Sequence, residues 1–135
     1  MAKFKHFLII FLLSFTAFVT SCSNEVDSNR IFFGGQIVNP SSTYVTLYKD
    51  NKTIDSLPLN LNYRFFKYYD SLESGIYKIE HIPEYKSVFL EKGDSIWVRI
   101  NASSFDESIV FSGRGAAKNN FMMDLLLSFE KENNF

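Results

Sequence analysis

The side chain with the most distinctive chemistry in this sequence is Cys22, the only cysteine among 135 residues. A lone thiol can act as a nucleophile or accept an acyl group, but it has no disulfide partner within its own chain. Two lysines, the thirteen-residue apolar run 7–19 and the small residues Thr20 and Ser21 precede it. This order is typical of a secretory signal peptide, and the run is shorter than the roughly 20 residues of a membrane-spanning helix. We therefore expect an exported protein that is acylated at Cys22.

The segment Val19-Thr20-Ser21-Cys22 resembles the lipobox of bacterial lipoproteins, in which an aliphatic residue and two small residues precede an obligate cysteine. The resemblance implies cleavage between Ser21 and Cys22 and attachment of acyl chains such as palmitate to Cys22. Two such chains hold a protein stably on a bilayer, so we expect a lipoprotein of the cell envelope. The outer membrane is the expected location, on either its periplasmic or its surface face. Residues 22–30 then form a lipidated tether, whose two acidic residues resemble the surface-export signals of Bacteroidetes lipoproteins or simply keep a linker solvated.

Charge and length limit the possible functions of the mature chain. Removing residues 1–21 takes away two of the 14 basic residues and none of the 15 acidic ones, which leaves a net charge of about −3. A mildly acidic protein lacks the electrostatic footprint of a nucleic-acid binder. The remaining residues are enough for one domain with one core.

Apolar residues alternate with polar ones from residue 31 onward, which is typical of half-buried strands. Turn residues divide this part of the chain into about eight short strands, so the sequence predicts a mainly β fold, an antiparallel sandwich or barrel, with one C-terminal helix. We expect a β-domain over 31–113 and a turn and helix over 114–135. The predicted strands cover residues 31–38, 43–49, 53–57, 63–69, 76–80, 86–90, 95–100 and 109–112.

Three short segments carry more specific predictions. The strand Tyr63–Tyr69 is aromatic on both faces, which predicts a central position between two layers. Gly34 and Gly35 predict a bulge or a close approach of the backbone. Pro58 either ends its strand or places it at a sheet edge.

The last segment changes from strand to helix spacing. Asn119 or Asn120 can cap a helix over Phe121–Glu132. Met123 and Leu127 are apolar but lie off the main stripe, and a helix that is apolar this far around is either deeply buried or waiting for a partner. The residues predicted to bind a partner are Phe121, Met122, Leu125, Leu126 and Phe129.

Three features together resemble the N-terminal β-domain of Bacteroidetes lipoproteins in the TlpA/ResA-like thioredoxin group. They are the first strand ending in Asn39-Pro40, the turn Phe89–Ser95 and the segment Phe111–Phe121. The resemblance implies that this domain precedes or accompanies a thioredoxin-like disulfide reductase. Because no Cys-x-x-Cys is present, it assigns no redox residue here. The chain is then a free-standing or truncated N-terminal module, or a fragment of a longer product.

The remaining candidates each have a plain structural alternative. Tyr44, Tyr48, Tyr68 and Trp97 are predicted to point outward, either as a platform for a glycan or peptide or as cross-strand packing. His81 is the only histidine of the mature chain, which is too little for a zinc site. The acidic residues are scattered through turns, so we expect no catalytic residue, no metal and no cofactor. Three Asp-Ser-aliphatic sequences resemble the O-glycosylation signal of Bacteroidetes, and their acceptors are Ser56, Ser71 and Ser95.

The sequence therefore predicts a non-enzymatic, lipid-anchored envelope module that associates with a thioredoxin-like domain or another envelope protein. The alternative is a free-standing lipoprotein that binds a glycan or peptide on an aromatic sheet face.

Overall fold

The computed structural model describes residues 29–133, so the predicted cleavage site and lipidation at Ser21 and Cys22 lie outside the described residues. Eight strands form two four-stranded sheets, and the fold is a sandwich rather than a closed barrel. The elements are β1 (Ile31–Val38), β2 (Tyr44–Lys49), β3 (Lys52–Pro58), β4 (Arg64–Tyr69), β5 (Gly75–His81), β6 (Glu84–Leu90), β7 (Ser95–Asn101), the 3-10 turn η2 (Ala102–Ser104), the short helix α2 (Phe105–Ser108), β8 (Val110–Arg114) and the helix α3 (Ala116–Asn133).

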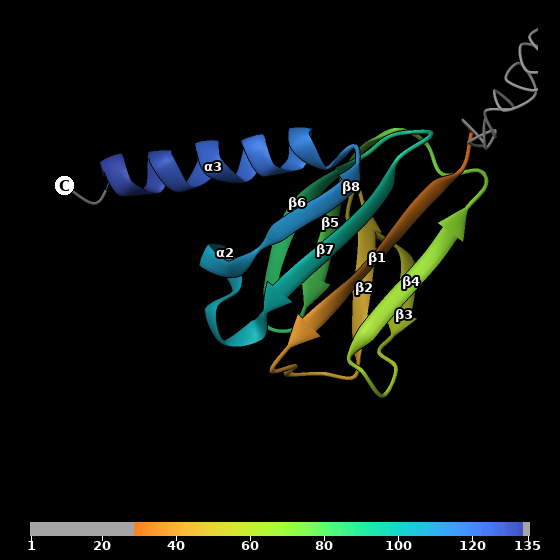
Figure 1. Cartoon of the computed structure of the whole chain (residues 1–135), viewed down its shortest axis with the longest axis horizontal. Helices are drawn as coiled ribbons and strands as arrows, with labels where there is room; N and C mark the ends of the chain where they lie inside the picture. The colour runs from red at the N-terminus through yellow and green to blue at the C-terminus, as the bar shows by residue number, and fades with distance from the viewer. Residues whose placement is uncertain (1–28, 134–135) are drawn as a thin grey trace, which may run out of the picture.

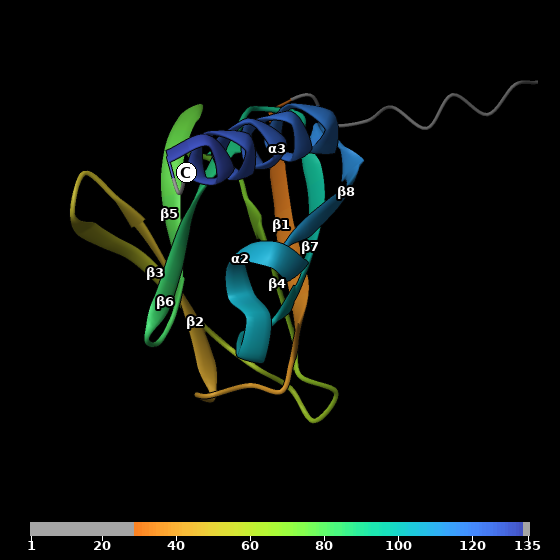
Figure 2. The same ribbon diagram turned by 90° about the vertical axis from the view of Figure 1, so that its left-hand side faces the viewer.

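Each of the two sheets contains four strands. Sheet A is β4-β1-β7-β8 and sheet B is β3-β2-β5-β6, and Figure 2 shows them as two layers with α3 passing over both. Alternation along each strand buries one face, as in Phe33 and Ile37 of β1 or Val45 and Leu47 of β2. The core therefore lies between the sheets, and each sheet turns its other face to solvent.

The pairing of β1 differs from a purely antiparallel sandwich. β1 is antiparallel to β4 but parallel to β7, with Phe32 opposite Ser95 and Val38 opposite Asn101. Parallel neighbours need a long crossover connection, and here all four strands of sheet B, together with β4 of sheet A, lie between β1 and β7 in the chain. Local strand patterns cannot reveal such a distant partner.

The prediction for the aromatic strand was wrong. β4 is at the edge of sheet A, and only Phe65 and Tyr69 face the core. Phe66 is 60% exposed and Tyr68 is 55% exposed. One aromatic face of β4 therefore packs in the core, and the other forms an exposed aromatic surface and is not covered by a second layer.

The β2–β3 hairpin turns at Asp50 and Asn51, which both have positive φ and are residue types that tolerate it. Two other local predictions were confirmed. β3 is an edge strand that ends at Pro58. Gly34 does mark a close approach, because a Cβ there would lie 2.8 Å from the Cβ of Phe66 and 3.1 Å from the Trp97 ring.

Polar contacts join the sheets along the β3–β4 side. Lys67 of β4 forms a 2.6 Å ion pair with Asp55 of β3, and the Tyr69 hydroxyl donates to the same carboxylate at 3.1 Å. Burial raises the pKa of Asp55, but Lys67 and Tyr69 outweigh it, so the pKa is lowered overall. Burial and the Asp55 charge both raise the pKa of Tyr69. The opposite side of the sandwich is closed by α3 (Figure 1).

Candidate functional site

The start of α3 is attached to both sheets by two adjacent asparagines. The Asn119 side chain donates to the Phe89 carbonyl at 2.8 Å and accepts from the Phe89 N–H at 2.7 Å. Asn120 makes the same pair of bonds with Phe111, at 2.8 and 2.9 Å. A carboxamide carries a donor and an acceptor side by side, so it matches the N–H and C=O of one strand residue. Each side-chain amide therefore pairs with the edge strand in the way that one residue of an additional strand would.

The two strands that receive these bonds are edge strands. β6 is an edge strand of sheet B and β8 is an edge strand of sheet A, so the backbone groups on their outer sides have no neighbouring strand. Unpaired edges of this kind invite association with other chains. Asn119 and Asn120 satisfy one position on each edge and fix α3 across the gap between the sheets.

This use of the asparagines corrects the sequence interpretation. Neither residue caps the helix, because α3 begins at Ala116, three residues before Asn119 and four before Asn120. Asn119 is fully buried, which is unusual for an amide unless all of its groups are bonded. The missed signal was an Asn-Asn pair inside a helix, because Asn119 is buried, Asn120 is half-buried, and both side chains need hydrogen-bond partners there.

An ion-pair cluster supports the same junction. Lys118 lies 2.8 Å from Asp94 and 2.9 Å from Glu91, both in the turn between β6 and β7. Burial lowers the pKa of Lys118, but the two carboxylates outweigh it and the pKa is raised overall. Gly115 precedes the helix with φ of 91°, and a Cβ there would lie 2.1 Å from an Asp94 carboxylate oxygen. The junction therefore requires glycine for its backbone conformation and for its space.

Two segments noted separately in the sequence thus meet in space. The turn Phe89–Ser95 and the segment Phe111–Phe121 contact each other through the asparagine bonds and the Lys118 cluster. The Arg114 Nε also donates to the Gly93 carbonyl. Together they determine the direction in which α3 leaves the sandwich.

The second half of α3 extends away from the sheets, as Figure 1 shows. Met123 is the last buried residue of the helix, and Met122 packs partly against the core. Leu127 is half-buried, and every described residue after it is exposed. The other predicted partner-binding residues are exposed, with Phe121 at 69%, Phe129 at 53%, Leu125 at 44% and Leu126 at 40%.

These apolar residues form one stripe. Phe121, Leu125 and Phe129 follow each other at spacings of four, which places them on the same side of a helix. Leu127 and Lys131, which are four residues apart, lie on the other side of the helix, and Lys131 is exposed. The predicted stripe is therefore present on the surface, with Met122 at its buried border.

The four aromatic residues predicted to form one platform do not share a face. Tyr44 and Tyr48 lie on the outer face of sheet B, whereas Tyr68 and Trp97 lie on the outer face of sheet A. On sheet A they are joined by Phe32, whose ring lies 4.9 Å from that of Tyr68, and by Phe66 at 6.5 Å from Phe32. The predicted platform did not include these two phenylalanines.

The only described histidine is structural. His81 is 1% exposed, its Nε2 accepts from the Ser41 N–H at 3.0 Å, and its Nδ1 lies 3.0 Å from the Tyr44 carbonyl. These contacts hold the β1–β2 loop against the end of β5. No group of three or more metal-ligating side chains is found within residues 29–133.

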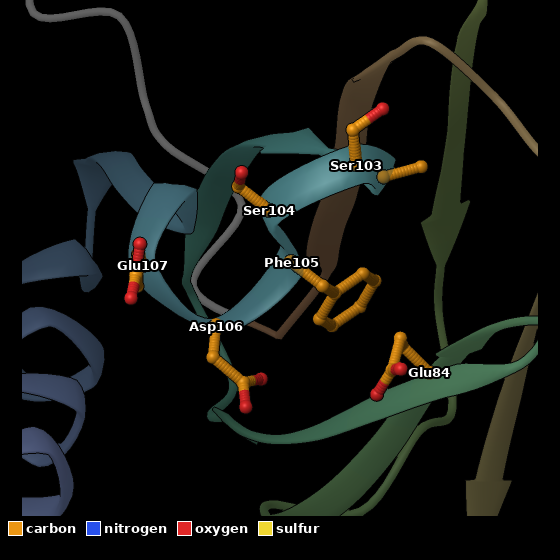
Figure 3. A pocket seen from close by; sticks show the side chains of 7 residues that line it. Glu84, Ser103, Ser104, Phe105, Asp106 and Glu107 are labelled. Carbon is orange, nitrogen blue, oxygen red and sulfur yellow. The ribbon is translucent and has the colours of Figure 1, made fainter.

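A shallow hollow beside α2 has a volume of about 390 Å³ (Figure 3). Glu84 of β6 and Asp106 of α2 border it, together with Ser103 and Phe105. Lys86 neutralises Asp106 at 3.0 Å. The hollow has hydroxyl and carboxylate groups but no histidine to activate a nucleophile, so its geometry does not indicate catalysis.

The predicted glycosylation acceptors differ in accessibility. Ser56 on β3 and Ser71 after β4 are exposed, whereas Ser95 is half-buried at the start of β7. Modification at Ser56 or Ser71 therefore stays a prediction that an intact mass with a sugar increment would confirm.

The chain was compared with protein-family models, curated proteins and solved structures, and none of them matches it significantly. None of the helices described between residues 29 and 133 has the length and apolarity needed to cross a bilayer. Function therefore has to be argued from the helix junction and the surfaces described above.

Proposed function

We propose that this protein is a non-catalytic, lipid-anchored module of the cell envelope that presents α3 to a thioredoxin-like domain. The supporting observation is the contrast within the helix between a buried, hydrogen-bonded start and an exposed apolar continuation. An apolar stripe in water gains free energy when a partner covers it. The stripe is held in a fixed direction by the junction, so little conformational freedom is lost on binding.

The thioredoxin-like partner is favoured by where the resemblance lies. The turn Phe89–Ser95 and the segment Phe111–Phe121 are two of the three features that carry it, and these two segments orient the helix. A lipid anchor at Cys22 and a short tether would keep the assembly close to the membrane and raise the effective concentration of the partner there.

Site-specific photocrosslinking tests the helix. A photoreactive phenylalanine analogue is placed at Phe121 or Phe129 in the cells that produce the protein, and adducts are identified by mass spectrometry. We expect adducts with a thioredoxin-fold domain at both positions and few at Lys131, which is exposed on the other side of the helix. Equal crosslinking at Lys131, or adducts only with a second copy of this chain, would contradict the proposal.

The anchor has a separate test. Cys22→Ala should abolish labelling by a fatty-acid probe and release the protein from membranes, because the lipid is the predicted attachment. Ser23→Ala is the matched control and should leave both unchanged. Labelling that persists in Cys22→Ala would exclude the lipobox interpretation.

A further inference from the structure

All four arginines of the chain lie on one surface. Arg64 of β4, Arg99 of β7 and Arg114 of β8 occupy outward-facing positions of sheet A. Arg30 directly precedes β1 and lies on the same side. The sequence as a whole has a net charge of −1, and no segment of it is rich in arginine. The fold therefore concentrates one kind of cation on one face of a protein that is otherwise slightly acidic.

The strand registers place these arginines around a set of aromatic rings. One row across the sheet is Tyr68, Phe32, Ser95 and Arg114. The next row is Phe66, Gly34, Trp97 and Ser112. The third row is Arg64, Gln36, Arg99 and Val110. We call this surface the arginine–aromatic face.

Gly34 gives the face its shape. It lies in the middle row between Phe66 and Trp97, and a Cβ at this position would lie 2.8 Å from the Cβ of Phe66 and 3.1 Å from the Trp97 ring. The two rings therefore border a position without a side chain, close to the centre of the sheet. The result is a flat apolar area with cations at its margins.

Three of the four arginines on this face have no carboxylate partner among the described residues. Arg30 pairs with Asp70 at 2.6 Å and lies 4.9 Å from the centre of the Tyr68 ring. Among the described residues, none of Arg64, Arg99 and Arg114 has a carboxylate within 4.0 Å. Arg64 instead lies 6.0 Å above the Trp97 ring. Their charge is therefore left for a ligand.

We infer that the arginine–aromatic face binds a saccharide chain that carries carboxylates, such as a uronate-containing glycan. Aromatic rings stack against the C–H faces of sugar rings, and the planar guanidinium group binds a carboxylate through two parallel hydrogen bonds. Backbone N–H and C=O groups in the middle of a sheet are used in its ladders, so this face offers an extended peptide no main-chain pairing. A saccharide needs only the rings and the cations.

A single-stranded nucleic acid would use the same two kinds of side chain. The envelope location favours the saccharide, and to this extent the inference depends on the proposed function. The mature chain also has a net negative charge outside the face, which opposes a polymer with one phosphate per nucleotide. The same experiment compares the two ligands.

Binding is measured by calorimetry with the full-length protein in detergent, using tetragalacturonate as the probe and galactotetraose as its neutral counterpart. We expect the acidic oligomer to bind at least about tenfold more tightly than the neutral one. The double variant Arg64→Gln/Arg99→Gln should weaken acidic binding at least about tenfold, and Phe66→Ala should weaken binding of both oligomers. Both arginines and Phe66 are exposed, so these variants should fold.

Lys78→Gln is the control, because Lys78 is a cation on the outer face of sheet B that lies 4.4 Å from the Tyr48 ring. We expect less than a twofold effect. The inference is overturned if wild-type protein does not bind tetragalacturonate at millimolar concentration, if Lys78→Gln weakens binding as much as the arginine variant, or if a ten-residue oligothymidylate binds more tightly through the same arginines. None of these results changes the crosslinking at Phe121 and Phe129, so this inference and the proposed helix contact can fail separately.

Discussion

The two halves of α3 are one continuous helix with opposite relations to the rest of the molecule. From Ala116 to Met123 the helix is held by paired amides, an ion-pair cluster and buried side chains. From Asp124 to Asn133 it has no buried side chain, yet it keeps several large apolar residues. Polar residues therefore fix the first half, and apolar residues remain exposed on the second. The usual assignment, in which apolar residues anchor a helix and polar residues face water, is partly reversed.

The two halves of α3 should differ most in how much a substitution lowers the free energy of unfolding, and removing a paired amide from the first half should have the largest effect. Asn119→Ala leaves the Phe89 N–H and carbonyl without their partner, and each unsatisfied buried group costs about 1–3 kcal/mol. We expect a loss of about 3 kcal/mol in the free energy of unfolding, measured by urea denaturation with the fluorescence of Trp97, the only tryptophan. Asp124→Ala on the exposed half is the control and should change stability by less than about 0.5 kcal/mol. A similar small effect for Asn119→Ala would show that the amide pairing does not stabilise the junction.

The Lys118 cluster should make a smaller, pH-dependent contribution. Lys118→Met should cost about 1 kcal/mol near neutral pH, since the side chain is partly exposed and its ion pairs are screened. The folded-state pKa of Lys118 is raised, so its stabilisation is complete below the unfolded pKa of about 10.4 and is lost as pH rises through the folded pKa. The difference between wild type and Lys118→Met should therefore be constant from pH 7 to about 9.5 and shrink above pH 10.5. A difference that grows with alkaline pH would contradict this sign.

Backbone dynamics should change along the helix. Amide hydrogen exchange should be slow for residues 120–123, whose opening requires the junction to break, and fast for residues 128–133, which can fray alone. Exchange measured by NMR at neutral pH would show the boundary near Met123. Uniform protection along α3 in the isolated protein would mean that the second half is stabilised by something other than the contacts described here.

The smallest stability effect should come from the exposed stripe. Phe129→Asp should change the free energy of unfolding by less than about 0.5 kcal/mol, because the side chain is more than half exposed. It should nevertheless abolish crosslinking from Phe121 to the partner, since a charge is buried on association. Glu130→Gln is a matched surface change that should leave both properties intact. A large loss of stability with Phe129→Asp would place this residue in the core instead of an interface.

The strands could be predicted from sequence because alternation is a local property. Ile96, Val98 and Ile100 alternate with Trp97 and Arg99, and the structure buries the first set and leaves the second outside. Sheet order was not predictable in the same way. The position of Tyr63–Tyr69 at an edge, and the parallel pairing of β1 with β7, depend on contacts between segments far apart in the chain.

The candidate sites show the same limit. The apolar stripe of α3 follows from helical spacing, and the structure leaves it exposed, while its binding of a partner stays a prediction. The roles of Asn119 and Asn120 depend on two edge strands, and the grouping of the arginines depends on registers between four strands. Each arginine alone is an ordinary surface residue of a strand, and only the folded sheet brings them together.

The position of β1 also has a mechanical consequence. The predicted tether leads directly into β1, which has β4 on one side and β7 on the other. Ladder hydrogen bonds run across the strands, so a pull along β1 from a membrane anchor loads the bonds to both neighbours in shear and at the same time. An edge strand pulled from its end could instead peel away one bond after another. An anchor at the predicted position would therefore pull on a strand that is held from both sides, and stretching the molecule from its N-terminus should meet more resistance than pulling on the exposed end of α3.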